Sequence, residues 1–82
     1  MLNLRKNNVL TPAQKRINEL KEELKYCQQQ IERTATLFEL ATEDELIEAR
    51  IYELKSLVVH HDYLTKTIKE LMMQQETEAI NI

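Results

Sequence analysis

The sequence predicts an all-α fold, and more specifically a two-helix antiparallel hairpin with coiled-coil-like packing. Its 82 residues include no Gly and a single Pro, whereas the helix-favouring residues Glu, Leu, Lys and Gln are abundant. Apolar residues recur three and four positions apart in two long stretches. Turn-forming residues, which β-sheet folds need every 8 to 12 positions or so, are almost absent after Pro12. We therefore exclude all-β and α/β folds.

The run TPAQ marks the start of the first helix. Thr11 can cap the free backbone amides, Pro12 suits the first helical position, and Gln14 can reach back to complete a capping box. The helix is predicted over residues 12–41. Its expected seam alternates three and four apart and contains Ile17, Leu20, Leu24, Cys27, Ile31, Thr34, Phe38 and Ala41.

A second capping box, made by Thr42 and Glu45, predicts a second helix over residues 43–74. Its first turn is acidic, as the helix dipole favours. No Gly marks the end of the first helix, so one continuous bent helix is an alternative to a turn here. The expected seam contains Ile47, Arg50, Leu54, Leu57, His61, Leu64, Ile68 and Leu71. Three further apolar residues widen this stripe: Ile51, Val58 and Met72.

The width of that stripe predicts an assembly. Both helices come to about 30 residues, or about 45 Å, so they match as a hairpin. A seam of two positions per heptad suits a two-stranded contact, whereas a broader stripe suits a helix that touches more neighbours. We therefore expect two hairpins to dimerise into a four-helix bundle, with docking on a larger protein as the alternative. Residues 11–74 form one domain, between a flexible arm (1–10) and a disordered tail (75–82).

The charge of the chain is uneven. Residues 1–33 carry seven basic and four acidic side chains, and the remainder carries four basic and ten acidic ones. The two halves should attract one another, and a basic half also raises the question of nucleic-acid binding. Because Glu residues are interleaved with the basic residues of the first helix, the local field is largely cancelled. We therefore expect no nucleic-acid partner.

The candidate chemical groups do not form a catalytic or metal-binding pattern. His60 and His61 are adjacent and point about 100° apart, and neither has a metal ligand three or four residues away. We expect His61 to be a polar seam residue that fixes register, with a pH-sensitive oligomer as the alternative. Cys27 falls in the seam, where a free cysteine packs as a small apolar residue. Without Gly there is no phosphate-binding loop. Because no nucleophile–base or metal constellation is found either, we expect no enzyme, no cofactor and no metal.

The compartment expected from the sequence is the cytoplasm. A single cysteine cannot form an intramolecular disulfide, and no signal-peptide pattern is found. No apolar run approaches the roughly 18 residues of a membrane span.

Three short runs in the second helix carry a family resemblance. DELIE at residues 44–48, IYELK at 51–55 and YL at 63–64 resemble the pattern of the YaaL-like family of short, uncharacterised proteins of Gram-positive bacteria. The chain departs from that pattern at residues 57–61, where LVVHH replaces the small and basic residues that the family tends to have. The resemblance implies a small cytosolic helical protein and no specific activity.

The predicted function is a non-enzymatic protein–protein interaction module, acting as a homodimer or docking on a larger protein. The residues expected at its interface are Ile47, Ile51, Leu54, Val58, His61, Leu64, Ile68 and Leu71. The alternative is a small regulator or inhibitor, such as one of phage type, of an enzyme or response regulator. Its acidic turn would enter a basic cleft through Glu43, Asp44, Glu45 and Glu48. Salt-sensitive binding would distinguish this alternative.

Overall fold

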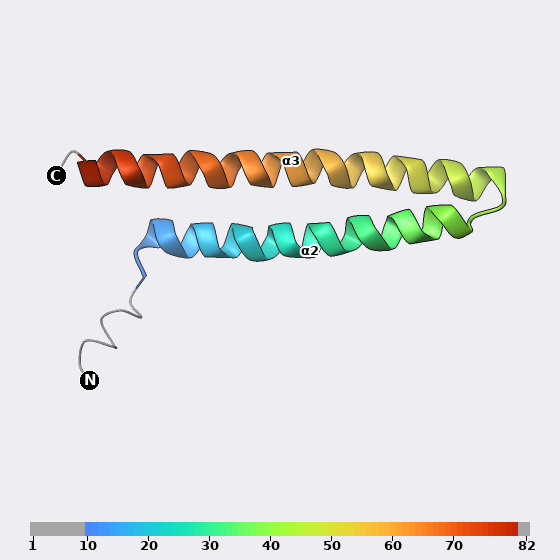
Figure 1. The fold of residues 1–82 in the computed structure, drawn as a ribbon, viewed down its shortest axis with the longest axis horizontal. Helices are drawn as coiled ribbons and strands as arrows, with labels where there is room; N and C mark the ends of the chain where they lie inside the picture. The colour runs from blue at the N-terminus through green and yellow to red at the C-terminus, as the bar shows by residue number, and fades with distance from the viewer. Residues whose placement is uncertain (1–9, 81–82) are drawn as a thin grey trace, which may run out of the picture.

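Two long helices run antiparallel and are joined by a short turn (Figure 1). The structure is a computed structural model that describes residues 10–80, with side chains as far as Thr77. Helix α2 spans Pro12–Leu40 and helix α3 spans Asp44–Ile80, and no strand occurs in this part of the chain. The predicted all-α helical hairpin is confirmed. Most of the predicted arm, residues 1–9, lies outside the described residues.

The start of α2 forms as its sequence predicts. The Gln14 backbone N–H donates to the Thr11 hydroxyl over 3.1 Å, and the Thr11 backbone N–H donates to the Gln14 side-chain oxygen over 3.0 Å. Pro12 follows the cap, at the start of the helix. This capping box satisfies two amides that have no partner inside the helix.

The connection between the helices is a turn, so the alternative of one bent helix is wrong. Ala41 adopts an extended conformation (φ −74°, ψ 133°), and its N–H donates to the Phe38 carbonyl over 3.2 Å. Helix α3 begins one residue later than predicted, which leaves Glu43 at the cap position, where its carbonyl accepts from the Ile47 N–H over 3.0 Å. The hydrogen bonds of the described residues accordingly include none in which the Thr42 hydroxyl accepts from the Glu45 N–H. The predicted capping box there does not form.

The end of α3 also differs from the prediction. Where a disordered tail is expected from Gln75, the helix continues to Ile80 and runs past the start of α2 (Figure 1). No Gly or Pro interrupts the chain here, and Gln, Glu and Ala are good helix formers. The Thr77 hydroxyl donates to the Met73 carbonyl over 3.0 Å, within the added turns. The last two residues, 81–82, lie outside the described part.

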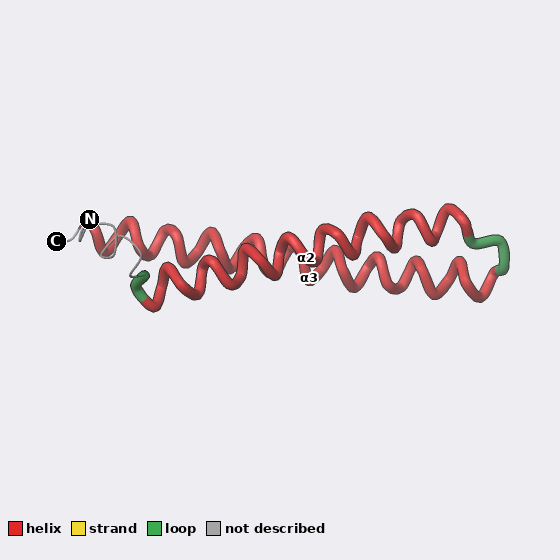
Figure 2. The backbone as a smooth tube through the Cα atoms, turned by 90° about the horizontal axis from the view of Figure 1, so that it is seen from below, coloured by secondary structure: helices red, strands yellow, loops and turns green. Residues whose placement is uncertain are grey.

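The core lies along the line where the helices meet, and in the perpendicular view they cross near their middle (Figure 2). Its fully buried apolar residues are Ile17, Leu20, Cys27, Leu64 and Ile68. Thr34 is the buried polar residue beside them, and four half-buried residues complete the packing: Leu24, Ile31, Leu57 and Leu71. Phe38, expected in the seam, is instead exposed, because it lies in the last turn of α2 where α3 is only beginning.

Neither helix has a segment of sufficient length and apolar character to cross a membrane, within the residues that the structure describes.

Candidate interaction surface

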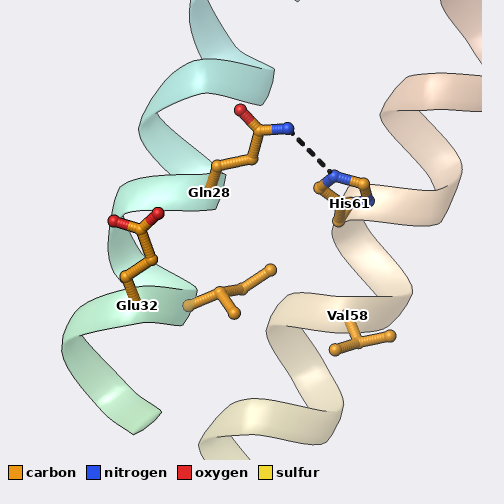
Figure 3. A pocket seen from close by; sticks show the side chains of 5 residues that line it. Gln28, Glu32, Val58 and His61 are labelled. Atoms are coloured by element: carbon orange, nitrogen blue, oxygen red, sulfur yellow. Dashed lines mark hydrogen bonds between the residues drawn. The ribbon is translucent and has the colours of Figure 1, made fainter. Parts of the chain in front are cut away.

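An open hollow lies between the two helices near the middle of the hairpin (Figure 3). Gln28, Ile31 and Glu32 line it from α2, and Val58 and His61 line it from α3. Its volume is about 550 Å³. We call the face of the hairpin that carries this hollow the groove side.

His61 takes a defined orientation in the hollow. The Gln28 amide nitrogen lies 3.4 Å from His61 Nε2, within hydrogen-bonding distance. Nδ1 lies 3.7 Å from a carboxylate oxygen of Asp62. The imidazole is thus held between the two helices, and it remains half-buried.

Apolar side chains continue along the groove side from Val58. Residues seven apart on a helix share a face, so the row through Val58 contains Ile51, Thr65 and Met72. We call these four residues the Val58 row. Val58 and Met72 are each 45% exposed, and the other two are half-buried. On α2, the row through Gln28 contains the exposed Lys21 and the half-buried Ala35. The apolar strip of the groove side is therefore contributed mainly by α3.

The face of the hairpin opposite the groove side is mainly polar. His60 Nε2 lies 3.5 Å from a carboxylate oxygen of Glu23, and the His60 ring stacks on Tyr63 with centroids 6.4 Å apart. At seven-residue spacing from Glu23 and His60, the same face carries Arg16, Gln30, Leu37, Leu46, Glu53, Thr67 and Gln74. Leu37 and Leu46 are the apolar members, and both lie next to the turn. The groove side and the opposite face of one hairpin thus differ in polarity.

A third set of apolar residues lies on the outer face of α3. Tyr52, Val59 and Met73 recur at seven-residue spacing with Lys66 among them, and the three apolar members are each more than 60% exposed. Val59 adjoins Val58 in the chain but points about 100° away from it. This outer row is therefore distinct from the groove side and supplies a matched control for it.

The structure divides the predicted interface residues between core and surface. Leu64 is 0% exposed and Ile68 is 7% exposed, so both are covered by α2. Five others are half-buried along the seam: Ile47, Ile51, Leu54, His61 and Leu71. Val58 alone in this set is exposed. The stripe is thus used partly inside the hairpin, and its remaining accessible part lies on the groove side.

Of the five residues that line the hollow, Val58 and His61 were predicted as interface residues. Ile31 was predicted only for the seam of the first helix, and Gln28 and Glu32 were not predicted. Both belong to α2, whereas the predicted interface used α3 alone. Gln28 directly follows the seam residue Cys27, and Glu32 directly follows Ile31. Positions that flank a seam on both helices form the walls of the groove, and this is the signal that could have found them.

The four acidic residues predicted to make electrostatic contacts lie at the turn end of the hairpin. Glu43, Asp44, Glu45 and Glu48 are all exposed. The ion pairs formed among described residues involve none of them. Their use against a basic cleft stays a prediction.

Cys27 is the chain's one nucleophilic thiol, and its surroundings make it unreactive. It is 2% exposed, and its thiol donates to the Leu57 carbonyl over 3.4 Å. Burial raises the pKa of the Cys27 thiol, and the negative charge of Glu23 raises it further. Across residues 10–77 no three His, Cys, Asp or Glu side chains come together as a metal site.

Comparison with known proteins does not identify a family for this chain. The resemblance to the YaaL-like family therefore stays a prediction. The chain matches no protein-family model, no curated protein and no solved structure.

Proposed function

We propose that this chain is a non-enzymatic self-association module, in which the groove side of one hairpin packs against the groove side of a second copy. The product is a four-helix bundle with a shared core. The observation that supports the proposal is the difference in polarity between the groove side and the opposite face of the hairpin. The Val58 row is mainly apolar, whereas the face of Glu23 and His60 is mainly polar.

The size of the core also supports association. Five apolar side chains are buried in the hairpin, along a single line of contact between two helices. In chains below about 70–80 residues, one hydrophobic core seldom contributes more than about 3–5 kcal/mol of stability, and such chains are commonly stabilised by oligomerisation. Burying a fully exposed Val, Ile or Met contributes about 1.5–3 kcal/mol. Val58 and Met72 are each 45% exposed, so each would contribute about half of this when a second surface covers it.

Substituting either of two adjacent valines tests the proposal. We expect the wild-type chain to show twice its mass of 9.8 kDa in sedimentation equilibrium. Val58→Asp places an unpaired carboxylate in the contact of both copies, and we expect it to weaken the dimer at least a hundredfold. Val59→Asp places the same charge on the outer row, and its dimer should survive.

Two outcomes would contradict the proposal. One is a wild-type chain that stays monomeric across the accessible concentration range. The other is a dimer that Val58→Asp weakens no more than Val59→Asp does. Helicity measured by circular dichroism on both variants shows whether either substitution unfolds the hairpin instead.

A further inference from the structure

The groove side carries an ordered set of charges on α2. Glu32 lines the hollow, and Lys25 precedes it by seven residues, so the two share a face. Glu39 follows at the same spacing. The charge along this face is therefore positive toward the open end of the hairpin and negative toward the turn, with Gln28 between the two. The ion pairs among described residues use neither Lys25 nor Glu32.

Helix α3 carries a matching set on the same side. Asp62 and Lys69 line a shallow hollow together with Thr65, a member of the Val58 row. Lys55 and Glu48 continue the line through Asp62 toward the turn, each at seven-residue spacing. Near the turn this line ends in Glu48; toward the open end it carries Lys69 and then Glu76, in the last turns of α3.

We propose that the second copy docks antiparallel, with its turn at the open end of the first and a two-fold axis passing between Gln28 and Val58. This inference rests on the proposed self-association and adds the orientation. An axis perpendicular to the helices stacks α2 on α2 and α3 on α3 of the two copies. The alternative, an axis along the bundle, stacks α2 on α3 and brings both turns to one end.

Charges near the middle of the groove side are compatible with both orientations. In the antiparallel arrangement Lys25 faces Glu32 of the second copy. In the parallel arrangement Lys25 faces Asp62 of the second copy, at the same level of the hairpin. Opposite charges meet in either case, so the middle of the hairpin does not select an orientation.

The ends of the hairpin select the antiparallel orientation. In the parallel arrangement Glu39 meets Glu48 of the second copy, beside the exposed acids of both turns. Like charges held together in this way repel. In the antiparallel arrangement Glu48 instead faces Lys69 of the second copy, because the two residues are nearly equidistant from Val58 along α3. This pair forms twice in the dimer.

In the middle of the groove side, apolar contacts are kept by the same arrangement. Val58 lies near the axis and meets its own copy, and Ile51 meets Thr65 of the second copy because both are seven residues from Val58. Met72, fourteen residues after Val58, faces Asp44 of the second copy by the same rule, so the apolar contact is confined to the middle of the dimer. A two-fold dimer requires such a self-complementary contact.

A zero-length carboxyl-to-amine cross-linker tests the orientation in the full-length protein. Glu48 and Lys69 are 21 residues apart on one helix, which is about 31 Å at 1.5 Å per residue. A link between them therefore has to join two copies. We expect mass spectrometry to find it, and in a mixture of ¹⁵N-labelled and unlabelled chains we expect it to join one of each.

Charge reversal gives the second measurement. Glu48→Lys and Lys69→Glu should each weaken the dimer roughly tenfold, because each turns two attractive pairs into repulsive ones. The double variant should restore the wild-type dissociation constant to within about threefold. Lys15→Glu, in the exposed row of Glu22, Gln29 and Thr36 on α2, is the matched control and should have little effect on the dimer.

The results separate this inference from the proposed function. A stable dimer that lacks the Glu48–Lys69 link, or a double variant no tighter than the single ones, overturns the antiparallel orientation and leaves self-association standing. A wild-type monomer overturns both.

Discussion

At the residue scale, the buried Cys27 thiol links stability to pH. Burial, and then the charge of Glu23, raise the pKa of this thiol above its ordinary value of 9.0. The folded state therefore keeps the proton at a pH where the unfolded state has lost it. The free energy of unfolding should be insensitive to this group below pH 9 and should fall as the pH rises above it.

Urea unfolding at pH 8 and at pH 10 measures this effect, with Cys27→Ser as the control. Serine keeps the size and the donor to the Leu57 carbonyl but does not titrate in this range. The wild-type protein should lose more stability between the two pH values than the variant does. Equal losses would show that the thiol ionises alike in the folded and unfolded states.

Residues also show how far the sequence could predict the site. Helical spacing placed Leu64, Ile68 and Val58 on one stripe, which is correct for the backbone. It could not tell that Leu64 is fully covered while Val58 is 45% exposed. That difference depends on which side of the stripe α2 occupies, and periodicity within one helix contains no such information. The groove residues Gln28 and Glu32 were missed for the same reason.

At the element scale, the capping box of α2 is a local device with a measurable contribution. Thr11→Ala removes the hydroxyl that accepts from the Gln14 N–H, and we expect it to cost about 1 kcal/mol of stability. Thr36→Ala is the control, since the Thr36 hydroxyl bonds to the Glu32 carbonyl inside the helix and alanine has the higher helix propensity. Urea unfolding followed by circular dichroism compares them. If Thr11→Ala costs no more than Thr36→Ala, the cap does not stabilise the hairpin.

The ends of the helices were predictable where a local signal exists. Thr11, Pro12 and Gln14 mark the start of α2 at the residue where it occurs. The turn was placed to within one residue, although the cap residue of α3 was assigned to Thr42 rather than Glu43. The sequence predicts too early an end for α3, because the apolar periodicity stops before the helix does. Helix-forming residues continue a helix without packing when nothing stops it.

At the scale of the whole molecule, the hairpin is an elongated body, 59 Å along its longest axis and 14 Å along its shortest. Two helices side by side form a single layer, so every core residue is close to a surface. Folding domains generally stack at least two layers around a core. A second hairpin on the groove side would supply the missing layer.

If pairing supplies that layer, then folding and association are one equilibrium, and thermal stability has to depend on protein concentration. For a dimer of two such chains, whose unfolding enthalpy is about 115 kcal/mol at 0.7 kcal/mol per residue, a hundredfold rise in concentration should raise the Tm by about 9 °C. Val59→Asp should show the same Tm as the wild type at each concentration, whereas Val58→Asp should melt at a lower Tm at every concentration. Melting curves followed by circular dichroism at several concentrations measure all three. A wild-type Tm that does not move would mean that one layer of two helices is stable alone, and that the exposed Val58 row is not needed for folding.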